Sequence, residues 1–246
     1  MKTTNKLLLG LLIASLLAIL SLMVYAKVSF KDSFVELSGK NVTLEEQIEP
    51  FTHLEVSGLL GIYYTQGETT GFRMEGDSAL VALVEIKQAG NKLDIKLDGK
   101  KVNKRVNIYL QNPELNDLKV VAGSRFVSEN QLTSNNLDVE VVAGGNAEID
   151  GIFEQLKVST VAGGRSKLSG KADKATMEGT AGSILNAYDL ESNYCDVNAV
   201  AGAKVEVLVI KELRANATAG GIIRYKGSPE LKEVNASAGG RLTNKN

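Results

Sequence analysis

The sequence predicts an all-β protein built as a parallel β-helix, a solenoid in which each coil stacks on the next. Three observations support this fold class. The dipeptide Ala-Gly recurs seven times in the second half of the chain, at spacings of 21, 19, 19, 20, 18 and 19 residues. Apolar and polar residues alternate on both sides of each copy, as in β-strands with one buried face. Helical periodicity is absent there, and repeats of this length with two or three short strands stack on their copies.

The chain begins with a segment that is typical of exported proteins. Two lysines precede an apolar run from Leu7 to Val24, and Val24-Tyr25-Ala26 fits the small-x-small cleavage pattern. The run is longer than the usual signal core of about 7–15 residues and near the short limit of a membrane span, about 17–25 residues. Residues 1–26 are therefore predicted to be either a signal peptide or an N-terminal membrane anchor helix. The remainder is expected in the periplasm or at the cell surface.

Residues 27–50 are interpreted as a polar linker, after which the pattern becomes β. Short alternating segments lie at residues 51–56, 61–66, 72–75, 84–88, 92–97 and 106–110. The Ala-Gly repeats then begin without a linker. We therefore expect one β-solenoid domain over residues 51–240, either continuous or as two tightly docked units. Its N-terminal β part covers residues 51–115 and its repeats cover residues 116–242.

Each predicted repeat consists of a strand, an Ala-Gly bend, a second strand and a polar turn such as Asp150-Gly151. The glycine suits a corner that needs a positive φ or has no room for a side chain. We expect the alanine beside it to point inward at a tight corner. Cys195 also falls on an inward position and is interpreted as a buried core thiol. The bends lie at Ala122-Gly123, Ala143-Gly144, Ala162-Gly163, Ala181-Gly182, Ala201-Gly202, Ala219-Gly220 and Ala238-Gly239.

Two outward columns of the repeats are candidate surfaces. The position before each alanine is β-branched in six repeats, and these residues are the candidate binding strip: Val121, Val142, Val161, Thr180, Val200 and Thr218. A flat strip of this kind suits binding or self-association, although β-branched residues also simply favour strands. A second column aligns Asn198, Asn216 and Asn235, which we expect to form a hydrogen-bonded amide ladder.

Composition excludes several classes of function. The chain carries 28 Lys+Arg against 29 Asp+Glu, which lacks the basic excess of a nucleic-acid binder. One cysteine and one histidine exclude an internal disulfide and the usual zinc centres. The Ala-Gly-Gly bends do not open helices, so they do not fit a phosphate-binding loop. No cofactor and no metal are expected.

A catalytic site is the weaker interpretation. Asp117 and Asp138 occupy equivalent positions in neighbouring repeats, and glycoside hydrolysis needs two carboxylates about 5–9.5 Å apart. The column continues with Lys157, however, and a solvated strand face gives the same pattern. His53 is the only imidazole, and no Gly-x-Ser-x-Gly elbow accompanies it.

Short strings in the first half carry a family resemblance. They are residues 51–58, 63–67, 74–77, 93–96 and 106–115. Together with the Ala-Gly-Gly repeats and the export segment, they resemble the auto-transporter adhesin head GIN domain family (DUF2807) over roughly residues 50–240. The resemblance implies a right-handed β-helix in a bacterium of the Bacteroidetes type. Because the sequence ends at Asn246 without a translocating barrel, we do not expect a complete autotransporter.

The sequence therefore predicts a non-enzymatic, exported β-solenoid of the cell envelope, an adhesin-like module that binds a surface polysaccharide or a surface protein. A membrane-anchored scaffold that self-associates into a homo-oligomer is the first alternative. A carbohydrate-active β-helix enzyme is the second. Nucleic acid is not expected as a partner, and the membrane is expected to contact only the N-terminal segment.

Overall fold

The computed structural model describes Ser21, residues 35–97, Val102 and residues 104–246. The predicted signal or anchor at residues 1–26 therefore lies, apart from Ser21, outside the described residues. No helix within the described ranges is long and apolar enough to cross a membrane. Leu37–Asp98 and Lys104–Asn246 form one compact unit.

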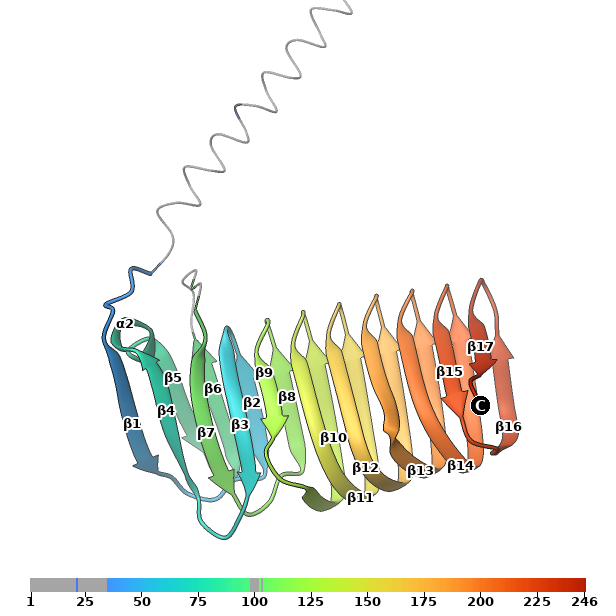
Figure 1. The fold of residues 1–246 in the computed structure, drawn as a ribbon, viewed down its shortest axis with the longest axis horizontal. Coiled ribbons are helices and arrows are strands. Elements are labelled where there is room, and N and C mark those ends of the chain that lie inside the picture. The colour runs from blue at the N-terminus through green and yellow to red at the C-terminus, as the bar shows by residue number, and fades with distance from the viewer. Residues whose placement is uncertain (1–20, 22–34, 98–101, 103) are drawn as a thin grey trace, which may run out of the picture. The chain divides into compact units, whose positions relative to one another are not determined.

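This unit is a β-solenoid, as the sequence predicts (Figure 1). A single helical turn, α2 (Ser78–Val81), interrupts the strands of the described chain. The strands before the repeats are β1 (Asn41–Gln47), β2 (His53–Ser57), β3 (Leu60–Gln66), β4 (Gly71–Asp77), β5 (Val84–Ala89), β6 (Lys92–Leu97) and β7 (Val106–Asn112). The strands of the repeats are β8 (Asp117–Val121), β9 (Arg125–Ser128), β10 (Leu132–Val142), β11 (Asn146–Val161), β12 (Arg165–Thr180), β13 (Ile184–Val200), β14 (Lys204–Thr218), β15 (Ile222–Lys226), β16 (Glu230–Ala236) and β17 (Arg241–Asn244).

Each coil contributes one segment to each of two sheets. We call the sheet that precedes the Ala-Gly turns sheet A and the sheet that follows them sheet B. Sheet A contains β5, β6, β2, β8, the C-terminal parts of β10 to β14, and β16. Sheet B contains β1, β4, β7, β3, β9, the N-terminal parts of β11 to β14, β15 and β17.

The repeats pair in parallel, with equivalent residues side by side. Val139, for example, pairs with Leu118 in the preceding coil and with Val158 in the following coil. All three side chains are 0% exposed, because alternate residues of every strand point between the two sheets. Stacking thus turns a short alternating pattern into a continuous apolar core.

The Ala-Gly pairs form tight turns along one edge of the stack (Figure 1). All seven alanines have φ between 48° and 55°, and the glycines that follow have φ between 69° and 79°. The Gly164 N–H donates to the Val161 carbonyl at 3.0 Å. This hydrogen bond closes a type I′ turn, in which both central residues are left-handed. The prediction of inward alanines is wrong, because these alanines are exposed.

The alanine conformation carries a cost that the stack offsets. A left-handed alanine is about 1–2 kcal/mol less stable than a right-handed one. Five of the seven turns, however, bond to the turn of the next coil: the Gly163 N–H, for example, donates to the Ala181 carbonyl at 3.2 Å, and the Gly182 N–H to the Ala201 carbonyl at 3.1 Å. The ladder therefore continues through the turns and keeps their polar groups paired.

The N-terminal part is stacked out of chain order. Strand β2 lies between β6 and β8 in sheet A, and β3 lies between β7 and β9 in sheet B. Strands β4 and β5 pair antiparallel with β7 and β6, and β1 pairs antiparallel with β4. Strand β1 falls within residues 27–50, which the sequence analysis interprets as a linker.

Two polar side chains hold this N-terminal part together. Asn112 is 0% exposed and bonds both the N–H of Phe51, at 3.2 Å, and its carbonyl, at 2.7 Å. Asp77 accepts the N–H groups of Gly39 at 2.8 Å and Ala79 at 3.0 Å, and two groups of Ser38. Burial opposes its charge, but these four bonds outweigh that effect and hold the pKa of Asp77 below its usual value.

Candidate functional site

The candidate binding strip is a partly exposed column on the outer face of sheet A, directly before the Ala-Gly turns. The ladder pairs Val142 with Val121, Thr180 with Val161 and with Val200, and Val200 with Thr218. The structure therefore brings these residues together in the predicted order. Their role in binding stays a prediction. The strip consists of Val121, Val142, Val161, Thr180, Val200 and Thr218.

The predicted amide ladder is confirmed. The Asn216 Nδ2 group donates to Asn198 Oδ1 at 3.2 Å, and Asn235 Nδ2 donates to Asn216 Oδ1 at 2.9 Å. These amides use each other as partners across successive coils. The ladder is therefore part of the structure of sheet A rather than an open row of ligand-binding groups.

A groove of about 1210 Å³ follows the opposite edge of sheet A, where the chain turns from sheet B into sheet A. Its outer wall is a column of aligned, exposed or partly exposed side chains from β10 to β14. Its floor includes the buried residues Leu137, Leu156, Ala175 and Cys195. The column consists of Asn136, Gln155, Lys174, Tyr194 and Glu212.

A second column lines the same groove and adds further charged residues. Lys157 Nζ lies 3.7 Å from Asp138 Oδ2 in the preceding coil. Arg214 Nη1 lies 3.8 Å from Asp196 Oδ1, and its Nη2 lies 2.9 Å from Glu212 Oε1. These exposed pairs contribute little to stability. They leave the groove with neighbouring donors and acceptors and no large excess of either charge.

Gln66 closes the N-terminal end of the groove. Its Nε2 donates to the carbonyls of Pro113 at 2.9 Å and Thr133 at 3.1 Å, and its Oε1 accepts the Thr133 N–H at 2.7 Å. One side chain thus joins β3 to the segment that precedes β8 and to the start of β10. Because this end is held by three hydrogen bonds, the groove entrance is preformed.

Tyr194 is the aromatic residue of the groove. It is 41% exposed, and Lys211 Nζ lies 5.4 Å from the centre of its ring. A tyrosine offers an apolar ring face together with a polar hydroxyl. With Asn136 and Gln155 in the same column, the groove combines an aromatic surface with amide donors and acceptors along several coils. Such a surface suits an extended polar ligand.

The sequence analysis missed this groove, although a signal was present. Its outer column stands seven residues before each Ala-Gly pair, and its spacings of 19, 19, 20 and 18 residues match those of the repeat. The residue types differ from coil to coil, so no motif recurs in the column. A search for a column with shared spacing rather than shared residues would find it.

The residues weighed for catalysis are only partly brought together. Asp117 and Asp138 are neighbours in the ladder, as expected, but Asp138 lines the groove and Asp117 does not. His53 Nδ1 contacts Thr52 Oγ1 at 2.9 Å and Asn91 Nδ2 at 3.2 Å. Within the described ranges, no hydrogen bond joins His53 to a carboxylate, and no three metal-ligating side chains cluster.

Cys195 is a buried core thiol, as predicted. It is 3% exposed, and burial raises the pKa of its thiol well above the usual value. The protonated thiol is a poor nucleophile. Cys195 therefore contributes to the floor of the groove as a packed side chain and not as a nucleophile.

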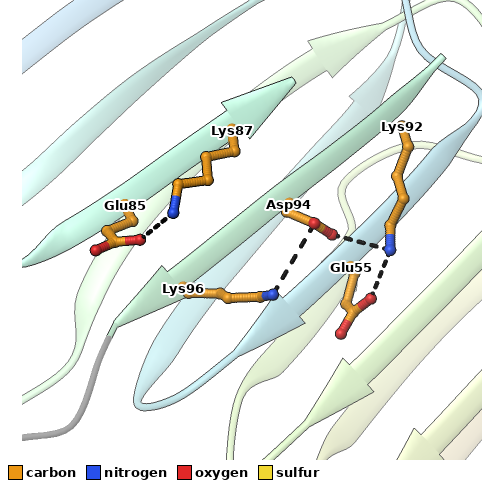
Figure 2. A network of polar contacts seen from close by, with 6 residues as sticks. All are labelled: Glu55, Glu85, Lys87, Lys92, Asp94 and Lys96. Carbon is orange, nitrogen blue, oxygen red and sulfur yellow. Dashed lines mark hydrogen bonds and ion pairs between the residues drawn. The ribbon is translucent and has the colours of Figure 1, made fainter. Parts of the chain in front are cut away.

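The outer face of sheet A changes character near the N-terminus, where it is covered by ion pairs (Figure 2). Lys92 Nζ lies 2.8 Å from Glu55 Oε2 and 3.2 Å from Asp94 Oδ1. Hydrogen bonds to Glu55 and Asp94 raise the pKa of Lys92 above its usual value. None of the residues in this network lines the groove, and we place the candidate site in the groove rather than here.

The fold and the groove define a β-solenoid with an extended polar groove along one face. The chain belongs to the family described as putative auto-transporter adhesin, head GIN domain, whose model matches residues 50–229. This match confirms the predicted family membership. No curated protein gives a significant match.

Solved structures share the fold. A putative adhesin from Bacteroides fragilis is 26% identical, with a TM-score of 0.78; the match covers 86% of this chain and 100% of that one. A putative adhesin from Parabacteroides distasonis is 17% identical, with a TM-score of 0.68 and coverages of 86% and 100%. A putative lipid binding protein from the same species is 16% identical, with a TM-score of 0.66 and coverages of 87% and 100%.

Proposed function

We propose that this protein is a non-enzymatic, exported binding module of the cell envelope that holds an extended surface polysaccharide in the groove of sheet A. The observation that carries this proposal is one groove column running across five coils, which holds two amides, a lysine, an exposed tyrosine and a glutamate. Amide groups and aromatic rings suit the hydroxyl groups and apolar faces of sugars. The family description as an adhesin supports an exported or surface location. We also take the solenoid to be right-handed, as the family resemblance implies.

The groove suits a chain-like ligand better than a small molecule. It is long, open along its side and lined by side chains from successive coils, so one ligand contacts equivalent positions repeatedly. The candidate binding strip lies at the other edge of the same face and would contact a wider partner, such as a surface protein. Replacing Val142, Val161 and Val200 by lysine changes the strip and leaves the residues of the groove in place. The variant therefore shows which of the two surfaces binds the partner.

The test is binding of the full-length chain to a glycan array and to isolated cell envelopes. We expect a glycan ligand whose affinity falls about tenfold, or 1.4 kcal/mol, in Tyr194→Ala. Tyr188→Ala is the matched control, because Tyr188 is a partly exposed tyrosine of the same strand that does not line the groove. Loss of binding only in the valine-to-lysine variant would move the site to the strip. Equal affinity in all variants would overturn both assignments.

The scaffold alternative rests on one observation. Strand β16 has no strand paired on its outer edge in the described chain, and its Leu231 and Val234 are 46% and 45% exposed. Open edges of this kind pair readily with other strands. Sedimentation of the full-length chain at increasing concentration should show association if this edge joins copies. A monomer at all concentrations would exclude the scaffold.

A further inference from the structure

The two outer faces of the repeats carry opposite charge. In the two central outward columns of sheet B, from β9 to β17, six cations stand against two acids: Arg125, Arg165, Lys167, Lys204, Arg224 and Arg241 against Glu148 and Glu206. In the corresponding columns of sheet A, from β8 to β14, three cations stand against five acids. The near-zero net charge of the chain therefore conceals a basic face.

One column of sheet B has a regular pattern, and we call it the cation column. It reads Arg125, Asn146, Arg165, Ile184, Lys204, Ile222 and Arg241 through seven consecutive coils. A cation stands at every second coil and a neutral residue at every coil between. Adjacent strands are about 4.8 Å apart, so the cations recur about every 9.6 Å.

Avoidance of repulsion does not by itself explain this column. On sheet A, repulsion between neighbouring coils is avoided by placing acids next to bases, as in the Lys119–Glu140 pair at 2.7 Å and the Asp138–Lys157 pair at 3.7 Å. The cation column contains no acid in seven coils. Its charges are therefore not arranged to neutralise each other along the stack.

The cations are held outward and in part unpaired. Arg125 and Lys204 bond to acids of the next column, Glu148 at 2.8 Å and Glu206 at 2.7 Å, which orients their side chains. Arg165 and Arg241 are exposed, and neither forms an ion pair with any other described residue. Ile184, which stands between Arg165 and Lys204, is 38% exposed.

We propose that the cation column binds a linear anionic polysaccharide that carries one acidic group for each disaccharide. A disaccharide unit of an extended sugar chain is close in length to two coils, and the isoleucines between the cations would contact its apolar faces. Nucleic acid fits poorly, because its phosphates recur about every 3.4 Å along a strand. This surface lies on sheet B, so the inference stands independently of the groove on sheet A.

The first experiment measures binding of the full-length chain to hyaluronate, a linear polysaccharide with one carboxylate per disaccharide, and to neutral dextran. We expect binding to hyaluronate that weakens with salt, and none to dextran. Arg165→Gln with Arg241→Gln should weaken binding about tenfold. Lys119→Gln with Lys232→Gln removes the same charge away from sheet B and should leave the affinity unchanged.

A second variant tests spacing separately from charge. Exchanging Arg165 and Ile184, by Arg165→Ile with Ile184→Arg, keeps composition and net charge but breaks the alternation. We expect affinity to fall as far as in the double glutamine variant, with an unchanged circular dichroism spectrum. Full affinity in the exchanged variant, or equal loss in the Lys119 and Lys232 control, would overturn the proposal. Absence of hyaluronate binding, or equal binding to phosphatidylglycerol vesicles through the same arginines, would overturn it as well.

Discussion

The repeats (residues 116–244) and the N-terminal part (residues 37–115) form the same two-sheet coil by different routes. In the repeats, each coil stacks on the coil that precedes it in sequence, and equivalent residues pair. In the N-terminal part, β2 and β3 are inserted between strands that come later in the chain, and β1, β4 and β5 run antiparallel to their neighbours. The repeats thus depend on local stacking, whereas the N-terminal part depends on contacts distant in sequence.

This difference shows where individual side chains matter. A repeat array shares its stability among many similar interfaces, so no one coil decides whether the fold forms. The N-terminal part has no such redundancy, and a single residue such as Asn112 joins segments 61 residues apart. The predictions below test this contrast from its largest expected effect to its smallest.

Asn112→Ala should cause the largest loss of stability. The substitution leaves the buried N–H and carbonyl of Phe51 without their side-chain partner, and each unsatisfied group costs about 1–3 kcal/mol. We expect unfolding free energy measured in urea to fall by about 3 kcal/mol. Asn198→Ala, in the exposed amide ladder, is the control and should cost about 0.5 kcal/mol or less. Equal losses would remove the proposed contrast between the two parts.

Gly221→Ala should have a large effect for a small change within the repeats. A Cβ at this position would lie 2.0 Å from the Ala199 carbonyl oxygen, so the backbone must shift. We expect a loss of about 2 kcal/mol in unfolding free energy. Gly220→Ala meets no atom within 4 Å and should cost only about 1 kcal/mol, because of its positive φ of 76°. A larger loss of unfolding free energy in Gly220→Ala than in Gly221→Ala would contradict the turn geometry.

Acid should loosen the N-terminal edge before it affects the repeats. The pKa of Asp77 is depressed in the folded state, so its contribution to stability is present above the ordinary carboxyl pKa. That contribution is lost as the pH falls through the lower, folded value. Hydrogen exchange should show residues 38–47 opening at acidic pH, while β11 to β14 remain protected. Asp77→Asn should make the protection factors of this segment, which are corrected for the intrinsic pH dependence of exchange, nearly independent of pH, and an unchanged pH profile would contradict the assignment.

The fold of the repeats is predictable because its determinants recur. The spacing of Ala122, Ala143 and their equivalents sets the coil length, and the alternation around them indicates the inward columns. The stacking order of the N-terminal part is not predictable in this way, since nothing in the sequence of His53–Ser57 specifies β6 and β8 as its neighbours. Strand β1 was missed because its exposed residues follow no clear apolar alternation.

The candidate site is only partly predictable from the sequence. The candidate binding strip and the amide ladder share one residue type through several repeats, so alignment by the Ala-Gly pairs reveals them. The groove column, with Gln155, Lys174 and Tyr194, and the cation column vary from coil to coil. The alanine conformation was missed because alanine rarely adopts a positive φ. Here that conformation follows from hydrogen bonds between successive turns, which appear only in the assembled stack.

The insertion of β2 and β3 has a consequence for the order in which the protein can mature. Whenever the chain emerges with its N-terminus first, β2 and β3 appear before both of their neighbours in the stack. Their two flanks are complete only when residues up to Ser128 have followed. Strands β2 and β3 therefore remain incompletely paired while synthesis or transport is under way. They become fixed only when the first coil of the repeat array arrives to cover them.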